Sequence, residues 1–283
     1  MLKISEKNLA VFSILPFFII FFMFQILPFI WILINSFYVE DSGYGLDNFI
    51  KILNSKFYQK SFEISFKISI ISSLISLIIA FLGSYSLYKI TPSKISTIFI
   101  SFNTMISNFS GVPLAFAFII LLGSQGVINI LFRDIFGIDT QINLYSNFGV
   151  NLVYIYFQIP LAILLLFPSF KILDEKIKDA NTILGASSIQ YWLKIGIPLL
   201  CQAILGVFVI LFANAIGAYA TIYALTSGNF NVIPIRIGAL ISGDLNLNPY
   251  LASALALLLV TLMVLVAFVI NLLSKRYNFK AKK

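Results

Sequence analysis

The 283-residue sequence contains no histidine and a single cysteine, Cys201, and only 11% of its residues are charged. The absence of histidine excludes catalytic triads and proton relays that use this residue. One cysteine cannot form an internal disulfide, and without histidine it cannot complete a transition-metal cluster. The sequence also lacks a Gly-x-x-x-x-Gly-Lys-Ser/Thr phosphate loop, so it provides no ATPase site of that kind.

The scarcity of charge indicates a membrane protein. Soluble domains carry about 25% charged residues, and one membrane-spanning helix needs about 20 apolar residues. Six charge-free stretches, each at least 21 residues long, cover 8–39, 68–88, 95–132, 140–170, 195–235 and 245–274. They do not alternate as the strands of a β-barrel do. The sequence therefore predicts an all-α polytopic membrane protein, one domain over 1–283, with transmembrane helices at 9–37, 66–88, 95–123, 147–169, 198–226 and 250–274.

Two of these stretches are longer than one span requires. Gly111 and Pro113 interrupt the third stretch, and they could free backbone groups to line a cavity. Unpaired backbone cannot face lipid, so the excess is expected to be loop packed against protein. Between the first two spans, "LDNFIKIL" predicts a short amphipathic helix after Asp47. Glu63 and Lys67 have the i,i+4 spacing of an ion pair.

The distribution of lysine and arginine predicts the orientation. Six spans place both termini on one side, and that side holds 13 of the positive residues against 6 on the other. The positive-inside rule then places both termini in the cytoplasm. This asymmetry explains the net charge of +8 without a nucleic-acid partner.

The cytoplasmic segment 171–197, between the fourth and fifth spans, differs from its oily surroundings. A charged, helix-compatible stretch ends at Gly185, which suits a left-handed helix end. Ser187 and Gln190 then form the Ser-x-x-Gln pattern of a capping box that starts a second helix, and Pro198 marks the return to the membrane. The pattern predicts an elbow projecting into the cytoplasm, and an ordinary interfacial helix is an equally open reading of it.

The spacing in this segment resembles the EAA loop of permease subunits of binding-protein-dependent ABC importers. That loop reads Glu-Ala-Ala, three residues, Gly, nine residues and Ile-x-Leu-Pro, and it precedes the penultimate helix. This chain keeps the spacing but has Asp179 for Glu, Asn181 for the second Ala and Ile197 for Leu. The positions that carry the resemblance are Asp179, Ala180, Gly185, Ala186, Ser187, Ile195 and Pro198.

The resemblance implies a type I ABC importer permease fold and a bacterial plasma-membrane location. In that family the loop is the coupling helix, which docks on a dimer of separate ATP-binding subunits. ATP and Mg²⁺ would then be bound by that partner, and this chain would be neither an enzyme nor a holder of cofactors or metals. Further implied partners are an extracytoplasmic solute-binding protein and a second permease chain that completes the pathway, a heterodimer being favoured over a homodimer.

Two stretches, "NFSGVPLAFAFIILLG" and "TSGNFNVIPIRIGALISGD", resemble the branch of spermidine/putrescine, ferric-iron and aminoethylphosphonate permeases. That branch implies a small charged solute such as a polyamine, a phosphonate or ferric iron. Alternatives are a stand-alone channel or secondary carrier, or a membrane scaffold that transports nothing. No acidic residue lies in the middle of a span, which argues against an ion-driven carrier.

Polar residues within the spans are candidates for the solute pathway, because such groups face the protein interior. The alternative is that each only hydrogen-bonds a neighbouring helix. The candidates are Asn103, Asn108, Gln158, Asn214, Tyr219 and Tyr223.

Overall fold

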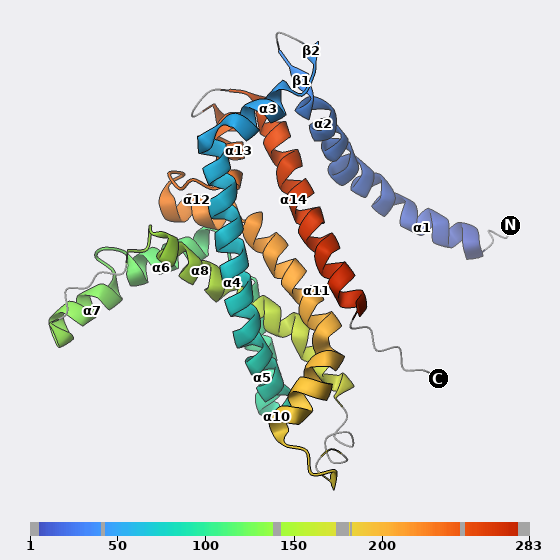
Figure 1. The fold of residues 1–283 in the computed structure, drawn as a ribbon, viewed down its shortest axis with the longest axis vertical. Helices are drawn as coiled ribbons and strands as arrows, with labels where there is room; N and C mark the ends of the chain where they lie inside the picture. Colours follow the sequence, from blue (N-terminus) through green and yellow to red (C-terminus); the bar gives the residue numbers. More distant parts are fainter. Residues whose placement is uncertain are drawn as a thin grey trace. The chain divides into compact units, whose positions relative to one another are not determined.

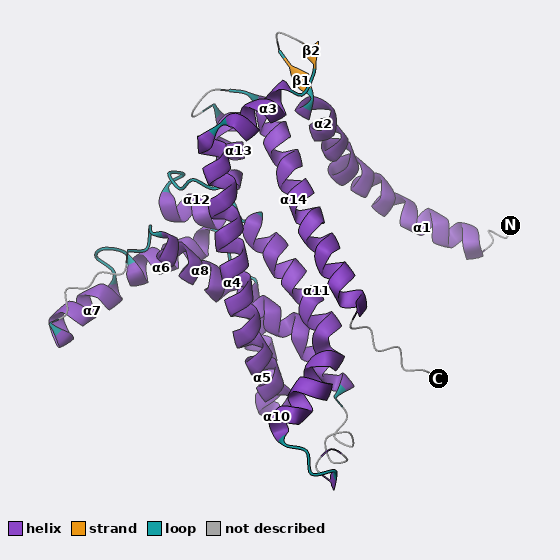
Figure 2. Cartoon of the chain, in the orientation of Figure 1, coloured by secondary structure: helices purple, strands orange, loops and turns teal. Residues whose placement is uncertain are grey.

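The computed structural model describes residues 6–40, 43–137, 143–173, 181, 183–243 and 247–276. Helices dominate these residues, beside one pair of short strands (Figures 1 and 2). Among the described residues, six helical segments are long and apolar enough to cross a membrane, namely Ile14–Ser36, Lys56–Lys89, Val112–Ile135, Asn147–Ile172, Ser188–Ile216 and Pro249–Ser274. The prediction of an all-α protein with six membrane helices is confirmed. The chain divides into two compact units.

The first unit comprises Met1–Gln59 and Arg236–Thr261. Its N-terminal span consists of α1 (Glu6–Phe21), a π-helical turn η1 (Phe22–Ile26) and α2 (Leu27–Ser36). Pro28 has no N–H to donate within the helix. The π turn precedes this proline, and there the Leu27 N–H donates to the Phe22 carbonyl, so the wider spacing accommodates the missing donor.

A short hairpin and a helix follow the first span. Strands β1 (Tyr38–Val39) and β2 (Gly43–Tyr44) pair antiparallel, and α3 (Asp47–Asn54) is the predicted amphipathic helix. The buried Asn48 amide donates to the Ser36 carbonyl at 3.3 Å and to the Tyr38 carbonyl at 2.9 Å. This one side chain therefore ties α3 to the end of α2.

An arginine is buried in the first unit. Arg236 belongs to α13 (Ile233–Ser242) and is only 9% exposed. Its guanidinium carbon lies 4.9 Å from the centre of the Phe57 ring, a cation–π distance. Burial lowers the pKa of the Arg236 guanidinium, and the nearby Tyr58 partly opposes this shift. The aromatic ring stabilises a charge that the fold has removed from water.

The second unit comprises Lys60–Ile235 and Leu262–Lys283, so α4 (Lys56–Lys89) and α14 (Pro249–Arg276) belong to both units. Its remaining elements are α5 (Lys94–Ser107), α6 (Val112–Leu122), α7 (Val127–Phe136), α8 (Asn147–Leu166), η2 (Phe167–Ile172), α10 (Ser188–Tyr191), η3 (Trp192–Gly196), α11 (Ile197–Ile216) and α12 (Ala220–Thr226). Helix α8 is its centre, since it packs against both α5 and α11.

Serine side chains and a glutamine join α4 to α8. Gln158 is fully buried, its amide nitrogen donates to Ser72 Oγ at 2.8 Å, and its amide oxygen accepts from Ser73 Oγ at 3.1 Å. Ser76 Oγ donates to the Ile155 carbonyl at 3.2 Å. Small residues let membrane helices approach closely and hydrogen-bond across their contact. The buried serines of α4 are Ser61, Ser65, Ser69, Ser72, Ser73, Ser76 and Ser84.

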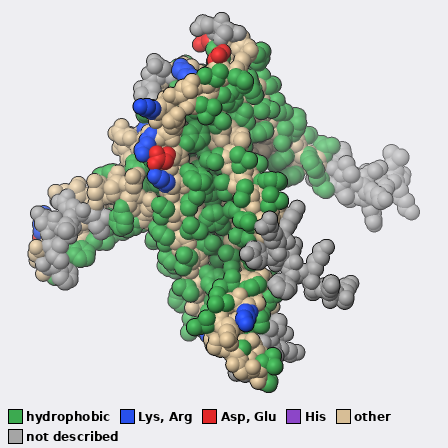
Figure 3. Space-filling model, viewed as in Figure 1, with side chains coloured by type: hydrophobic (Ala, Val, Ile, Leu, Met, Phe, Trp, Pro, Cys, Tyr) green, Lys and Arg blue, Asp and Glu red, His purple; other side chains and the backbone are tan. Residues whose placement is uncertain are grey.

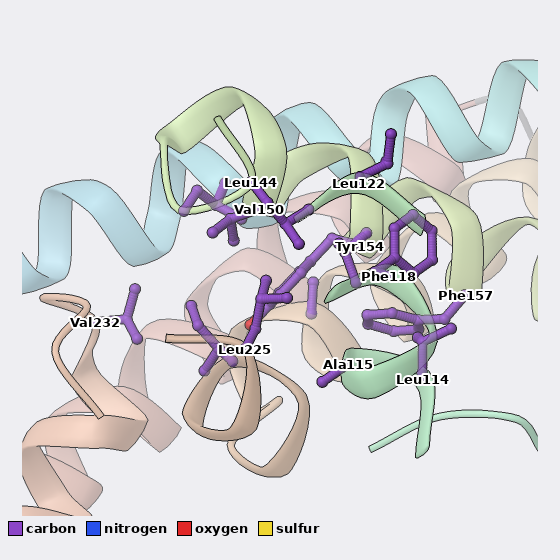
Figure 4. Close-up of a cluster of buried hydrophobic side chains, with 14 of the residues drawn as sticks. Leu114, Ala115, Phe118, Leu122, Leu144, Val150, Tyr154, Phe157, Leu225 and Val232 are labelled. Atoms are coloured by element: carbon purple, nitrogen blue, oxygen red, sulfur yellow. The ribbon is translucent and has the colours of Figure 1, made fainter. Parts of the chain in front are cut away.

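Apolar side chains of α6, α8 and α12 form the larger core cluster of this unit (Figure 4). Leu114 from α6 and Val150 from α8 are completely buried, and Leu225 from α12 is 1% exposed. Tyr154 lies among them and donates its hydroxyl to the Ala218 carbonyl at 3.2 Å. The cluster therefore holds the break between α11 and α12 against α8.

Two predicted spans differ from the structure because each is two helices. The stretch 95–123 divides into α5 and α6 around Gly111, whose φ of +72° is strained for any residue with a Cβ. The stretch 198–226 divides into α11 and α12, with α11 capped by Gly217. The Gly111 N–H donates to Thr221 Oγ1 at 3.0 Å. The two breaks therefore meet, and a side chain from one satisfies backbone freed by the other.

We expect Gln158→Leu to lower the free energy of unfolding by about 1 kcal/mol, because it removes two interhelical hydrogen bonds while keeping most of the side-chain volume. Gln202→Leu on the exposed face of α11 is the matched control and should change little. Thermal unfolding of both variants in one detergent measures the difference. Equal effects of the two substitutions would contradict the interhelical role of Gln158.

Candidate functional site

The predicted elbow is present in the part of segment 171–197 that the structure describes. Gly185 has φ +73°, and the Ala186 N–H donates to the Asn181 carbonyl at 3.1 Å. A left-handed glycine followed by this hydrogen bond is the Schellman helix ending, so the predicted helix end at Gly185 is confirmed. Two predicted site residues, Asp179 and Ala180, lie outside the described residues.

The second helix of the elbow starts with the predicted capping box. The Gln190 N–H donates to Ser187 Oγ at 3.3 Å, and the Ser187 N–H donates to Gln190 Oε1 at 3.0 Å. The two side chains thus satisfy two backbone donors that a helix start leaves open. The turn between Gly185 and Ser187 is therefore fixed on both sides by hydrogen bonds.

A π-helical turn carries the elbow into the fifth span. Turn η3 covers Trp192–Gly196, and the Ile197 N–H donates to the Trp192 carbonyl. Pro198 follows this π turn as Pro28 follows η1, so the wider spacing again accommodates the donor that proline lacks. The half-buried Ile195 and Pro198 lie where the chain re-enters the bundle, as their spacing predicts.

An aromatic clamp fixes the base of the elbow to the end of α4. The Trp192 ring lies 4.9 Å from the Tyr85 ring and 5.6 Å from the Phe81 ring, both edge-on. The fully buried Phe170 contacts Phe81 at 5.3 Å, and Tyr88 donates its hydroxyl to the Leu173 carbonyl at 2.7 Å. Edge-to-face aromatic pairs add stabilisation beyond that of burial.

Gly196 is needed for this clamp. A Cβ at residue 196 would lie 2.5 Å from Trp192 Cε3, so no larger residue fits without moving the ring. Trp192 and the aromatic residues of α4 were not among the site residues predicted from the sequence. The pattern that indicates the α4 residues is the spacing of Phe81, Tyr85 and Tyr88, which places three aromatic rings on one face of a helix.

Large apolar side chains are exposed at the tip of the elbow. Ile183 and Leu184 precede the turn at Gly185 and are 86% and 83% exposed. Ile189 follows the turn and is 70% exposed. Apolar residues gathered on a projecting surface mark a contact with another protein or a membrane. These three residues flank the predicted Gly185, Ala186 and Ser187, and sequence reasoning missed them because apolar residues are common in this chain.

Two of the predicted pathway residues are bound between helices. Asn103 on α5 donates its amide to the Pro160 carbonyl of α8 at 2.8 Å, and Gln158 is buried against α4 as described above. Both side chains hydrogen-bond a neighbouring helix, as the alternative hypothesis for polar residues in membrane helices predicts. A role for either in a solute pathway stays a prediction.

The other four predicted pathway residues are exposed on this chain. Asn108 ends α5, where its amide donates to the Thr104 carbonyl at 2.8 Å. Tyr219 and Tyr223, with rings 5.2 Å apart, lie at the start of α12, and Asn214 lies near the end of α11. Asn108 and Tyr219 therefore belong to the two helix breaks that meet at Gly111 and Thr221. A role for any of these four residues in a solute pathway also stays a prediction.

Comparisons with known sequences give partial matches. No protein-family model matches the sequence. The chain is 29% identical over 136 residues to the "Probable sulfate transport system permease protein cysT" of Prototheca wickerhamii, and the match covers 48% of this chain and 53% of the relative. It is 30% identical over 105 residues to the protein of the same name in Chlorella vulgaris, covering 37% and 38%. The matches span about half or less of these relatives.

Solved structures match over most of the chain. A bacterial ABC transporter involved in the import of the acidic polysaccharide alginate has a chain with a TM-score of 0.75 at 17% identity, covering 96% of this chain and 97% of that one. The MetNI methionine ABC transporter gives a TM-score of 0.57 at 15% identity, covering 77% of this chain and 95% of its own. The protein therefore has the type I fold of ABC importer permeases.

Proposed function

We propose that this chain is the permease subunit of an ATP-driven solute importer. It forms half of the pathway and couples to a separate ATP-binding subunit through residues 179–198. The observation that carries the proposal is the elbow at Gly185, which is capped on both sides, clamped at its base and apolar at its tip. A surface that transmits force between subunits must be rigid and must offer its partner a contact. The hydrogen bonds of the elbow support the first requirement, and its exposed apolar side chains support the second.

The clamp explains how a docked partner would move the membrane helices. Trp192 contacts α4 through Tyr85 and Phe81, and η3 continues directly into α11. A displacement of the elbow tip would therefore move the ends of α4 and α11 together. Packed cores have discrete arrangements rather than continuous ones, so such a displacement favours a switch between two states of the bundle.

The remaining partners follow from this role. The ATP-binding subunits would form a dimer and hold ATP and Mg²⁺, since this sequence has no phosphate loop. A second permease chain would complete the pathway, with a heterodimer favoured over a homodimer, and an extracytoplasmic binding protein would deliver the solute. A bacterial plasma membrane, with both termini in the cytoplasm, fits the lysine and arginine distribution. The structurally similar alginate importer was solved in complex with a periplasmic protein that holds an alginate pentasaccharide, which supports this kind of partner.

The solute is proposed to be small and charged. The branch resemblance pointed to a polyamine, a phosphonate or ferric iron, and the comparisons give that branch no support. The matched relatives are named for sulfate, and one structural neighbour imports an acidic polysaccharide. These names favour an anion over a polyamine.

Gly185→Val tests the elbow, because valine at φ +73° costs about 1–2 kcal/mol in this conformation. We expect the Kd for the ATP-binding subunit to rise about tenfold and solute uptake to fall in proportion. The measurement is co-purification and titration of candidate ATP-binding subunits from the same organism, followed by uptake in proteoliposomes.

Gly137→Val is the matched control for that experiment. Gly137 ends α7 with φ +63°, and, as at Gly185, an added Cβ would meet nothing within 4 Å. The strain is therefore similar, and binding of the ATP-binding subunit should be unchanged. Failure of the unsubstituted chain to bind any ATP-binding subunit would overturn the proposed function.

Gly196→Ala tests the clamp at the base of the elbow. The added Cβ overlaps the Trp192 ring, and such overpacking costs about 1–3 kcal/mol. Gly206→Ala, in α11 with open space around it, should instead stabilise the helix by up to about 1 kcal/mol. Trp31 and Trp192 are the two tryptophans of the chain, so a Trp31→Phe background isolates Trp192 fluorescence. The first variant should shift this emission and lower the melting temperature, and the second should do neither.

A further inference from the structure

A hollow between α4 and α8 has a charged end and an apolar end. The charged end, of about 230 Å³, is lined by Lys60, Glu63 and Lys67 from α4 and by Asn147 and Asn151 from α8. The apolar end, of about 380 Å³, is lined by Ile71, Ile75, Phe148, Leu152 and Ile155. The two parts share Ile71, Asn147 and Asn151, so they form one continuous groove. All of these residues belong to the second unit.

The charged end has one excess positive charge. Glu63 pairs with Lys60 at 2.9 Å and with Lys67 at 2.6 Å, which confirms the predicted pair with Lys67 and adds a second. Two ammonium groups against one carboxylate leave a charge of +1. Helix α8 begins at Asn147, and a helix N-terminus adds partial positive charge at this end. Figure 3 shows basic and acidic side chains gathered beside a face that is otherwise largely hydrophobic.

The groove matches the layers of a bilayer. Lys67 is the last charged residue before the charge-free stretch 68–88. The charged end of the groove therefore lies at the edge of the hydrocarbon core of the bilayer. Ile75 lies eight residues further along α4, which is about 12 Å deeper. The charged end therefore lies in the headgroup layer and the apolar end lies among the acyl chains. Phe148, which is 68% exposed, borders the groove where lipid would surround it.

We propose that this groove binds one phospholipid with a single negative charge, of the phosphatidylglycerol class. Lys60, Lys67 and the N-terminus of α8 hold the phosphate, and one acyl chain lies along Ile75 and Leu152. A transported solute fits less well, because a charged solute needs polar groups along its path and the deeper half of the groove is apolar. The proposal depends on insertion in a membrane and not on the coupling role of the elbow.

Native mass spectrometry of the full chain, released from detergent, tests the site. Phosphatidylglycerol, phosphatidylethanolamine and phosphatidylcholine with identical acyl chains are titrated separately. We expect one phosphatidylglycerol to bind with a Kd about tenfold below that of phosphatidylcholine. Lys60→Gln with Lys67→Gln changes the charge of the site from +1 to −1 and should raise the Kd for phosphatidylglycerol about tenfold. Ile75→Trp fills the apolar end and should weaken all three lipids.

Matched variants separate the groove from general surface effects. Lys51→Gln removes an exposed lysine of α3, outside the groove. Ile79→Trp is the control for Ile75→Trp. Ile79 lies one turn further along α4 and is 42% exposed, close to the 39% exposure of Ile75, but it does not line the groove. Both controls should bind phosphatidylglycerol as the unsubstituted chain does.

Three outcomes would overturn the proposal. The first is equal affinity of the unsubstituted chain for all three lipids. The second is an equal loss of binding in the control variants. The third is absence of lipid binding together with a dimer that Ile75→Trp dissociates, which would assign the groove to a second copy of the chain. Binding of ATP-binding subunits is measured separately, so failure of the lipid site leaves the proposed function untouched.

Discussion

Backbone N–H and carbonyl groups that leave a helix within hydrocarbon must find a partner in the protein, and this constraint governs the helix breaks of the second unit. Gly111 lies in the break between α5 and α6, and its N–H donates to Thr221 Oγ1 near the break between α11 and α12. Lipid cannot supply such a hydrogen bond. The two breaks therefore stabilise each other, and the core around Tyr154 and Leu225 is built where they meet.

The same need for internal satisfaction shapes the packing of α4. Its serines bind Gln158 and carbonyl groups of α8 rather than water. Toward its C-terminal end the face changes from serine to aromatic residues, where Phe81 and Tyr85 meet Trp192. One helix thus holds α8 along its middle and the elbow at its end, which is the mechanical continuity that the proposed coupling requires. The charged turns near its start contribute the headgroup end of the groove.

The elbow combines rigidity with exposure. Hydrogen bonds at Gly185, Ser187 and Gln190 fix the turn, while Ile183 and Leu184 remain more than four-fifths exposed. Exposed apolar side chains on a fixed turn offer a partner a preorganised contact, which reduces the entropy lost on binding. The aromatic clamp of Trp192, Phe81 and Tyr85 then connects the elbow to α4, and η3 connects it to α11.

The sequence by itself determined the helical class, the number of membrane spans and the local geometry of the elbow. These features depend on neighbours along the chain: runs of apolar residues, a glycine that tolerates positive φ, and Ser187 with its capping partner three residues later. The tertiary structure alone decided which breaks meet, that Gln158 faces serines of α4, and that Trp192 packs against Phe81 and Tyr85. Each of these is a contact between residues 85 to 111 positions apart. Apolar periodicity in a chain that is 60% hydrophobic does not mark which face of a helix meets which neighbour. In lipid both faces can be apolar, so the pattern that identifies the core of a soluble protein carries less information here.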